Sequence, residues 1–129
     1  MQARNRPLFA AVGAASVSSD SLVVLGESGD PVPDRARLSQ IQVDLVWDGK
    51  GGSGPLSWVL TSDAEGDRLI WSGETDATDA LTSGDLASAQ LVLGDDGIAW
   101  PGSGGLLYLW LSLASGAADA TATLIGEQR

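Results

Sequence analysis

Apolar and polar residues alternate along several short stretches of the chain. Between Gln40 and Asp48 every second residue is apolar, and the apolar set is Ile41, Val43, Leu45 and Trp47. Of the residues between them, Gln42 and Asp44 are polar or acidic, and Val46 is apolar. A period of two is that of a strand with one buried and one exposed face. This stretch therefore predicts a half-buried strand with Trp47 in the core.

The glycine-rich stretch "DGKGGSGP" (residues 48–55) interrupts this alternation, which resumes at Leu56, Trp58 and Leu60. Glycine is favoured where a chain reverses direction, because it adopts backbone conformations that other residues avoid. The sequence predicts a β-hairpin here, with "DGKGGSGP" as its turn and Trp58 in the core beside Trp47. "GKGGSG" lacks the residue order of a phosphate-binding loop, and no helical pattern follows it.

Further strands are expected on both sides of this hairpin. They are "SLVVL" (21–25), "RLIWSG" (68–73), "GLLYLWLSLASG" (105–116) and "ATATLIG" (120–126), the last two joined by a turn at "SGAAD" (115–119). The segment 82–97 allows two interpretations: a short helix capped by Thr82 or Ser83, or a strand over "AQLVL" (89–93) that ends at the 94–97 turn. Seven or eight short strands separated by Gly, Asp, Ser and Pro predict an all-β fold, an antiparallel β-sandwich or jelly roll.

The first 17 residues differ from the rest of the chain. Their layout of basic residues, then a mildly apolar stretch, then small residues is that of a secretory signal, but the apolar stretch has few large side chains. We expect an extended N-terminal arm at 1–17 and a single sandwich domain at 18–129.

Residues 1–7 contain Arg4 and Arg6 and no acid, which leaves five basic residues against 17 acidic ones in the remainder. A basic arm on an acidic body predicts docking on an acidic partner through Arg4, Arg6, Leu8 and Phe9; the alternative is a solvated terminus.

Charge and composition exclude several classes of function. A net charge of −10 repels phosphate backbones, so nucleic acid is not expected as a partner. The absence of cysteine and histidine excludes disulfides, cysteine–histidine zinc sites and histidine acid–base chemistry. No stretch approaches the roughly 20 apolar residues of a membrane-spanning helix.

Candidate catalytic and metal-binding residues are few. Lys50 is the only lysine, and its glycine-rich surroundings would leave it hydrated and charged. Two carboxylates would suffice for a glycosidase, but nearly all the acids fall in loops or on polar faces, so we expect no enzymatic activity and no cofactor. "DAEGD" places Asp63, Glu65 and Asp67 at alternating positions, as in a calcium loop, although its glycine is not where an EF-hand needs it. A structural calcium ion there is the alternative to an ordinary turn.

The three remaining tryptophans lie near turns or on a second strand face. Trp71 and Trp100 are at strand ends, and Trp110 is on the face of its strand opposite Leu109 and Leu111. Tryptophan at such positions is found in the core, in protein interfaces, or stacked on a sugar. We place Trp71 and Trp100 among the partner-binding residues. A platform of Trp71, Trp100 and Trp110 would instead make the chain a carbohydrate-binding module.

The arm "MQARNRPLF", the acidic Gly/Ala/Thr-rich body and the closing stretch "GLLYLWLSLASGAADATATLIG" are similar to those of small accessory proteins of tailed-bacteriophage virions, the head decoration or cement proteins. The resemblance implies a non-enzymatic protein on the capsid exterior that binds capsid subunits, forms a homo-oligomer such as a trimer, and stabilises the shell. In that interpretation Arg4 and Arg6 pair with acids of the capsid.

Overall fold

A computed structural model describes residues 8–18, 21–29, 31–75, 86–94, 97–100, 102 and 105–128. These residues form eight strands and no helix. The strands are β1 (Leu8–Val17), β2 (Ser21–Leu25), β3 (Ser28–Gly29), β4 (Ala36–Thr61), β5 (Leu69–Thr75), β6 (Leu86–Val92), β7 (Ile98–Trp100) and β8 (Leu107–Gln128). Within these residues, then, nothing forms a helix that could cross a membrane.

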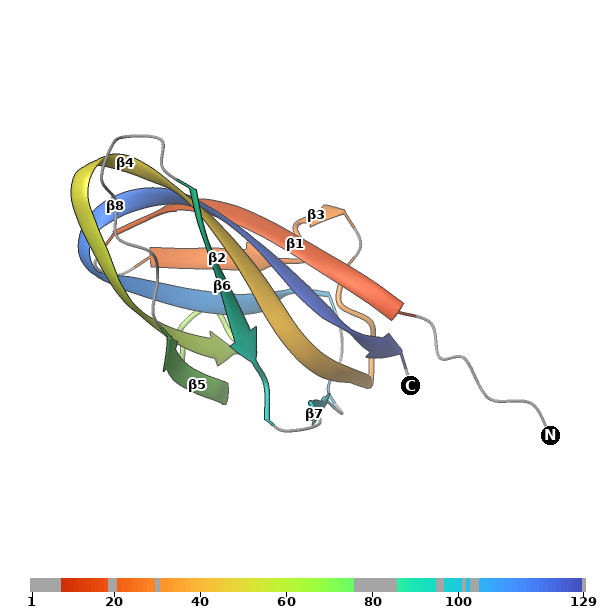
Figure 1. Cartoon of the computed structure of the whole chain (residues 1–129). Helices are drawn as coiled ribbons and strands as arrows, with labels where there is room; N and C mark the ends of the chain where they lie inside the picture. The colour runs from red at the N-terminus through yellow and green to blue at the C-terminus, as the bar shows by residue number, and fades with distance from the viewer. Residues whose placement is uncertain are drawn as a thin grey trace.

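Two of these strands are far longer than the others and bend in the middle (Figure 1). They pair with each other along most of their length, from Ala36 with Gln128 to Thr61 with Tyr108, and the register shifts near Ser53. The expected hairpin at "DGKGGSGP" and the expected turn at "SGAAD" are therefore wrong, because each stretch is the bend of one continuous strand. Both bends contain glycine, which tolerates a sharp change of strand direction.

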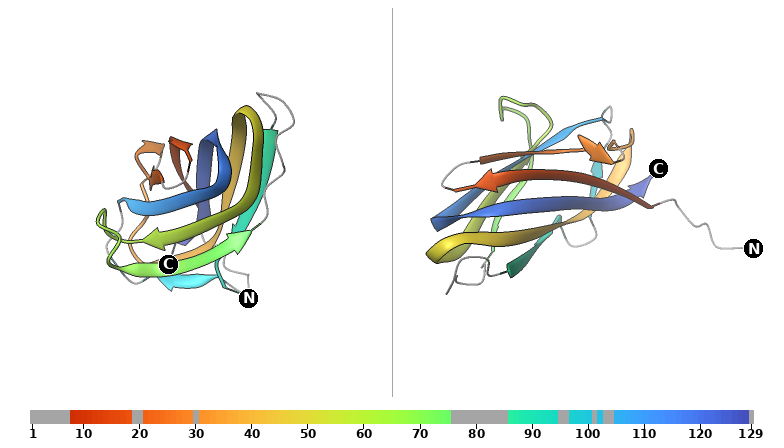
Figure 2. Two further views of the ribbon diagram at one scale, coloured as in Figure 1. Left: turned by 90° about the vertical axis from the view of Figure 1, so that its left-hand side faces the viewer. Right: turned by 90° about the horizontal axis from the view of Figure 1, so that it is seen from above.

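The bends divide the paired strands between two layers (Figure 2). In the first sheet, β1, the C-terminal half of β8, the N-terminal half of β4, and β6 lie in that order. In the second sheet the order is β2, the N-terminal half of β8, the C-terminal half of β4, and β5. The short strands β3 and β7 pair with β1 and β4. Two antiparallel four-stranded layers joined in this way form a jelly roll, which confirms the predicted fold class.

The core fills the space between the sheets, and the period-two patterns predict most of it. The alternating residues Ile41, Val43, Leu45 and Trp47 are all buried, as is Trp58. On β8, Leu107, Leu109, Leu111 and Leu113 face inward, as do Ala120, Ala122 and Leu124 beyond the bend. The segment with two interpretations contains a strand, β6, whose Leu91 is buried.

The expected arm over residues 1–17 needs a correction. Residues Leu8–Val17 form β1, which pairs with β8 along its whole length and belongs to the sandwich. Phe9 is only 6% exposed, and its ring lies over Gly126. The inward residues of β1 include Ala11 and Gly13, which give almost no hydrophobic signal, so the alternation of the sequence does not predict this strand. Residues 1–7, with Arg4 and Arg6, lie outside the described residues.

Candidate interaction surface

The outer faces of the two sheets differ in chemistry. On the first sheet most outward side chains are polar or small, although Val46 and Val92 are exposed among them and Leu8 is exposed at the start of β1. Asp44 is exposed, as its pattern predicts, and its Oδ1 accepts hydrogen bonds from Ser88 Oγ at 2.9 Å and Gln42 Nε2 at 3.3 Å. Gln90 Nε2 also donates to Gln40 Oε1. The centre of this outer face is therefore covered by polar side chains that hydrogen-bond to one another.

The outer face of the second sheet has a strip of apolar side chains that crosses β2, β8 and β4. The ladder places Leu22 of β2, Trp110 of β8 and Val59 of β4 in one row. The next row contains Val24 and Tyr108. Every one of these side chains is at least partly exposed. A continuous apolar strip of this kind on an acidic protein is typical of an interaction surface.

Trp110 is held in one orientation by buried polar groups. Its indole Nε1 donates to Thr61 Oγ1 at 3.0 Å, and the Thr61 hydroxyl in turn donates to the carbonyl oxygen of Asp63 at 2.8 Å. Thr61 is fully buried. The 62–68 loop lies against the ring, because a Cβ at Gly66 would be 3.4 Å from the indole Cζ2. The indole ring of Trp110 is therefore held in position and remains partly exposed to solvent.

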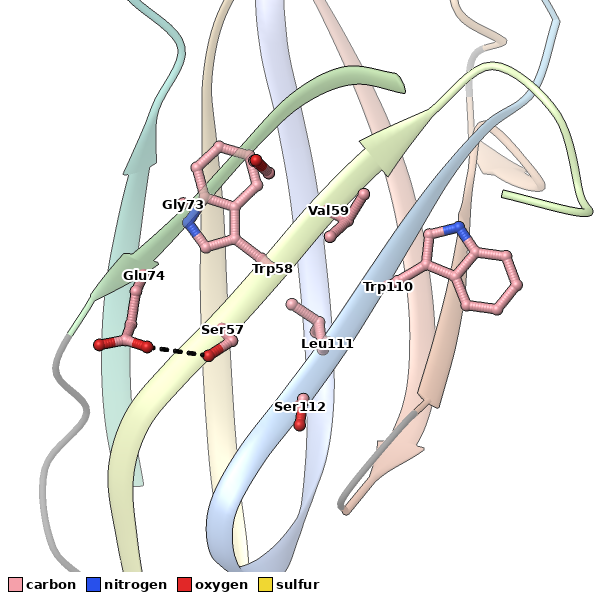
Figure 3. A pocket seen from close by; sticks show the side chains of 9 residues that line it. Ser57, Trp58, Val59, Gly73, Glu74, Trp110, Leu111 and Ser112 are labelled. Atoms are coloured by element: carbon pink, nitrogen blue, oxygen red, sulfur yellow. Dashed lines mark hydrogen bonds between the residues drawn. The ribbon is translucent and has the colours of Figure 1, made fainter. Parts of the chain in front are cut away.

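A shallow hollow of about 440 Å³ lies beside the indole ring of Trp110 (Figure 3). It crosses β5, β4 and β8, and its outward side chains are Ser57, Val59, Ser72, Glu74, Trp110 and Ser112. Ser57 Oγ donates to Glu74 Oε2 at 3.2 Å, which holds the carboxylate at the β5 side. A second hollow, of about 280 Å³, shares Val59 and Trp110 with the first and is also lined by Glu65 and Gly66. Trp110 thus borders two adjoining hollows, each with one carboxylate.

The 62–68 loop contains the three acids of the expected calcium site. Asp63 closes the loop with its carboxylate: Oδ1 accepts from the backbone N–H of Arg68 at 2.8 Å, and Oδ2 from that of Asp67 at 3.0 Å. These two hydrogen bonds, that from Arg68 first, lower the pKa of Asp63 below its ordinary value. Among the described residues no group of three acidic side chains is placed to hold a metal ion.

The predicted partner-binding residues that the structure describes do not form one surface. Leu8 is 71% exposed at the start of β1, whereas the Phe9 ring is in the core. Trp100 is half-buried against the core, and no partner for its Nε1 is found among the described residues. Trp71 is 42% exposed on β5, the edge strand of the second sheet.

The register also excludes the three-tryptophan platform expected for a carbohydrate-binding module. Trp71 pairs with Leu60, which faces the core, whereas Trp110 pairs with Val59 on the outer face. Residues directly opposite each other on paired strands project to the same side, so Trp71 and Trp110 lie on opposite faces of the second sheet. Of these three tryptophans, Trp110 alone lines the hollows. Its position on the second face of an otherwise core-forming strand was the sequence signal for this surface.

Compared by sequence, the chain matches no protein-family profile and no curated protein. Compared by structure, it is similar to a chain of the cyanophage Pam1 capsid asymmetric unit, with a TM-score of 0.52 and 10% sequence identity. That match covers 100% of this chain and 93% of the other. Eiger TNF from S. frugiperda matches with a TM-score of 0.47 and 13% identity, over 96% of this chain and 94% of the other. At 10% identity, the similarity to the Pam1 chain shows a shared fold alone.

Proposed function

We propose that this protein is a non-enzymatic structural protein of a virion, which binds capsid subunits on the shell exterior and stabilises the shell as a decoration or cement protein. The observation that carries the proposal is the similarity to the Pam1 capsid chain, which extends over the whole chain. The match thus extends along nearly the full length of both chains.

The chemistry of the two outer faces supports this role. A shell-bound protein needs one face that docks and another that remains hydrated. The second sheet has the apolar row of Leu22, Trp110 and Val59, and the first has the hydrogen-bonded polar surface around Asp44. The net charge of −10 disfavours contact with the packaged nucleic acid and is consistent with a position outside the shell.

The test is to locate the protein on particles and measure its effect on them. Particles would be purified from host cells that carry the gene and from cells that lack it, and labelled with gold-conjugated antibody against the protein. We expect label on the outside of the shell, and we expect shells without the protein to open at a lower temperature until purified protein is added back. Absence of the protein from purified particles would refute the proposal.

Two matched variants test which of the two outer faces binds the shell. Leu22→Glu places a charge on the apolar outer face of the second sheet, and Thr121→Glu places one on the polar outer face of the first. We expect only Leu22→Glu to lose binding to shells that lack the protein, because burying an unpaired carboxylate in an interface is unfavourable. Equal binding of both variants would show that the second sheet is not the docking face.

A further inference from the structure

The surface around Trp110 has the chemistry of a site for a cation. The indole is fixed by its hydrogen bond to Thr61, and it borders both hollows. Glu74 lines one hollow and Glu65 the other. A guanidinium group stacks favourably on an indole face, and it forms its strongest hydrogen bonds with carboxylates.

Nothing basic in the described part of the chain occupies this surface. Neither hollow is lined by an arginine or lysine. Residues 8–129 contain 17 acids and five bases, so the potential over the body is negative and attracts a positive ligand. The surface is therefore complementary to an extended segment that is basic and partly apolar.

The chain itself contains such a segment. Residues 1–7, "MQARNRP", have two arginines and no acid, and apolar Leu8 follows them. In an extended chain, side chains two positions apart project to the same side about 7 Å from each other. Arg4 and Arg6 could thus reach the two hollows together. A segment of seven residues spans at most about 25 Å.

The topology favours contact between copies over contact within one chain. Leu8 pairs with Glu127, and Val17 pairs with Ala118 beside the bend of β8, so β1 runs toward the bends. The chain before Leu8 therefore starts at the end of the first sheet that is far from the bends. Trp110 lies on the outer face of the other sheet, nearer the bends. To reach its own Trp110, the segment would have to reverse direction and also pass around the edge of the sandwich.

We propose that residues 1–7 of one copy bind across the Trp110 surface of a second copy, with Arg4 and Arg6 against the indole, Glu65 and Glu74. The contact links copies of the chain into a homo-oligomer. This proposal goes beyond the virion role and does not depend on it, because association can be measured on the purified protein without any particle.

Sedimentation velocity of the full chain over a range of concentrations tests the proposal. We expect association at about 50 mM NaCl that weakens at about 1 M NaCl, because salt screens contacts between exposed charges. The double variant R4E/R6E, and separately E65K/E74K, should each weaken association about tenfold or more. The variant with all four substitutions should associate again, because the charges are exchanged and complementary.

The control variant E27K/D119K changes the net charge as E65K/E74K does, at exposed sites on other surfaces. It should associate as the wild type does. The proposal would be overturned by a wild type that stays monomeric at all concentrations, or by association that survives R4E/R6E. It would also be overturned if the variant with all four substitutions remained monomeric although circular dichroism showed it to be folded.

A second measurement uses a synthetic peptide of residues 1–9 with the R4E/R6E variant. We expect the peptide to shift the indole N–H resonance of Trp110, assigned with Trp110→Phe, and to shift it far less in a chain that also carries E65K/E74K. Maltohexaose and cellohexaose serve as neutral sugar probes. A shift with either sugar and none with the peptide would overturn the proposal in favour of a glycan site.

Discussion

The indole Nε1 of Trp110 donates a hydrogen bond to the buried hydroxyl of Thr61, at a distance of 3.0 Å between the two heavy atoms. Through this bond the strand β8 and the C-terminal end of β4 fix the side chain that borders both hollows. The same hydroxyl donates to the carbonyl oxygen of Asp63, so the 62–68 loop is tied to the same point. The shape of the candidate surface therefore depends on one threonine.

Thr61→Val should destabilise the protein by about 1–3 kcal/mol, because it leaves the Trp110 N–H and the Asp63 carbonyl without their partner while it keeps the side-chain volume. Urea denaturation followed by circular dichroism measures the change. Thr121→Val is the matched control on the exposed outer face of the first sheet, and we expect it to change stability by less than about 0.5 kcal/mol. Similar losses in both variants would contradict a structural role for the Thr61 hydroxyl.

Gly13→Ala should be strongly destabilising. A Cβ at this position would lie 2.1 Å from the carbonyl oxygen of Val24, so β1 and β2 would have to move apart. Overpacking of this kind costs about 1–3 kcal/mol or more. Ala14→Val on the exposed side of the same strand adds volume without such a contact and should have little effect on the urea midpoint. A Gly13→Ala protein as stable as the wild type would show that the two strands can separate freely.

Asp63 should make a pH-dependent contribution to stability. Its pKa is lower in the folded protein than the ordinary value of about 3.9, so the carboxylate favours folding above that value. This contribution is lost as the pH falls through the lower, folded-state pKa. The difference in unfolding midpoint between wild type and Asp63→Asn should therefore be largest near neutral pH and shrink below about pH 4. A difference of the same size across this range would contradict the assignment.

Calcium should not stabilise the 62–68 loop. Both carboxylate oxygens of Asp63 already accept backbone N–H groups, and a cation there would have to displace these hydrogen bonds. We expect the same thermal unfolding midpoint with about 5 mM calcium chloride as with an excess of EDTA, since a ligand that binds only the folded state would raise it. A midpoint that rises with calcium and falls again on chelation would support a calcium site at Asp63, Glu65 and Asp67.

Part of the candidate surface could be predicted from the sequence and part could not. The exposure of Trp71 and the half-buried position of Trp110 agree with their places near turns or on a second strand face. The sequence could not show that these two tryptophans face opposite sides of one sheet. That depends on the register against β4, which places Trp71 opposite the inward-facing Leu60 and Trp110 opposite the outward-facing Val59.

The sequence by itself determined the fold class and the inward faces of the strands, because a period of two is a local property that burial must obey. Ile41, Val43 and Trp47, and the leucines of β8, lie where their alternation predicts. Only the tertiary structure decided that the glycine-containing stretches at 48–55 and 115–119 are bends. A glycine run allows either a tight turn or a bent strand, and the choice depends on which distant strand supplies the hydrogen bonds. Here β4 and β8 pair on both sides of their bends, and this long-range pairing brings Ser57, Glu74 and Trp110 together on one face.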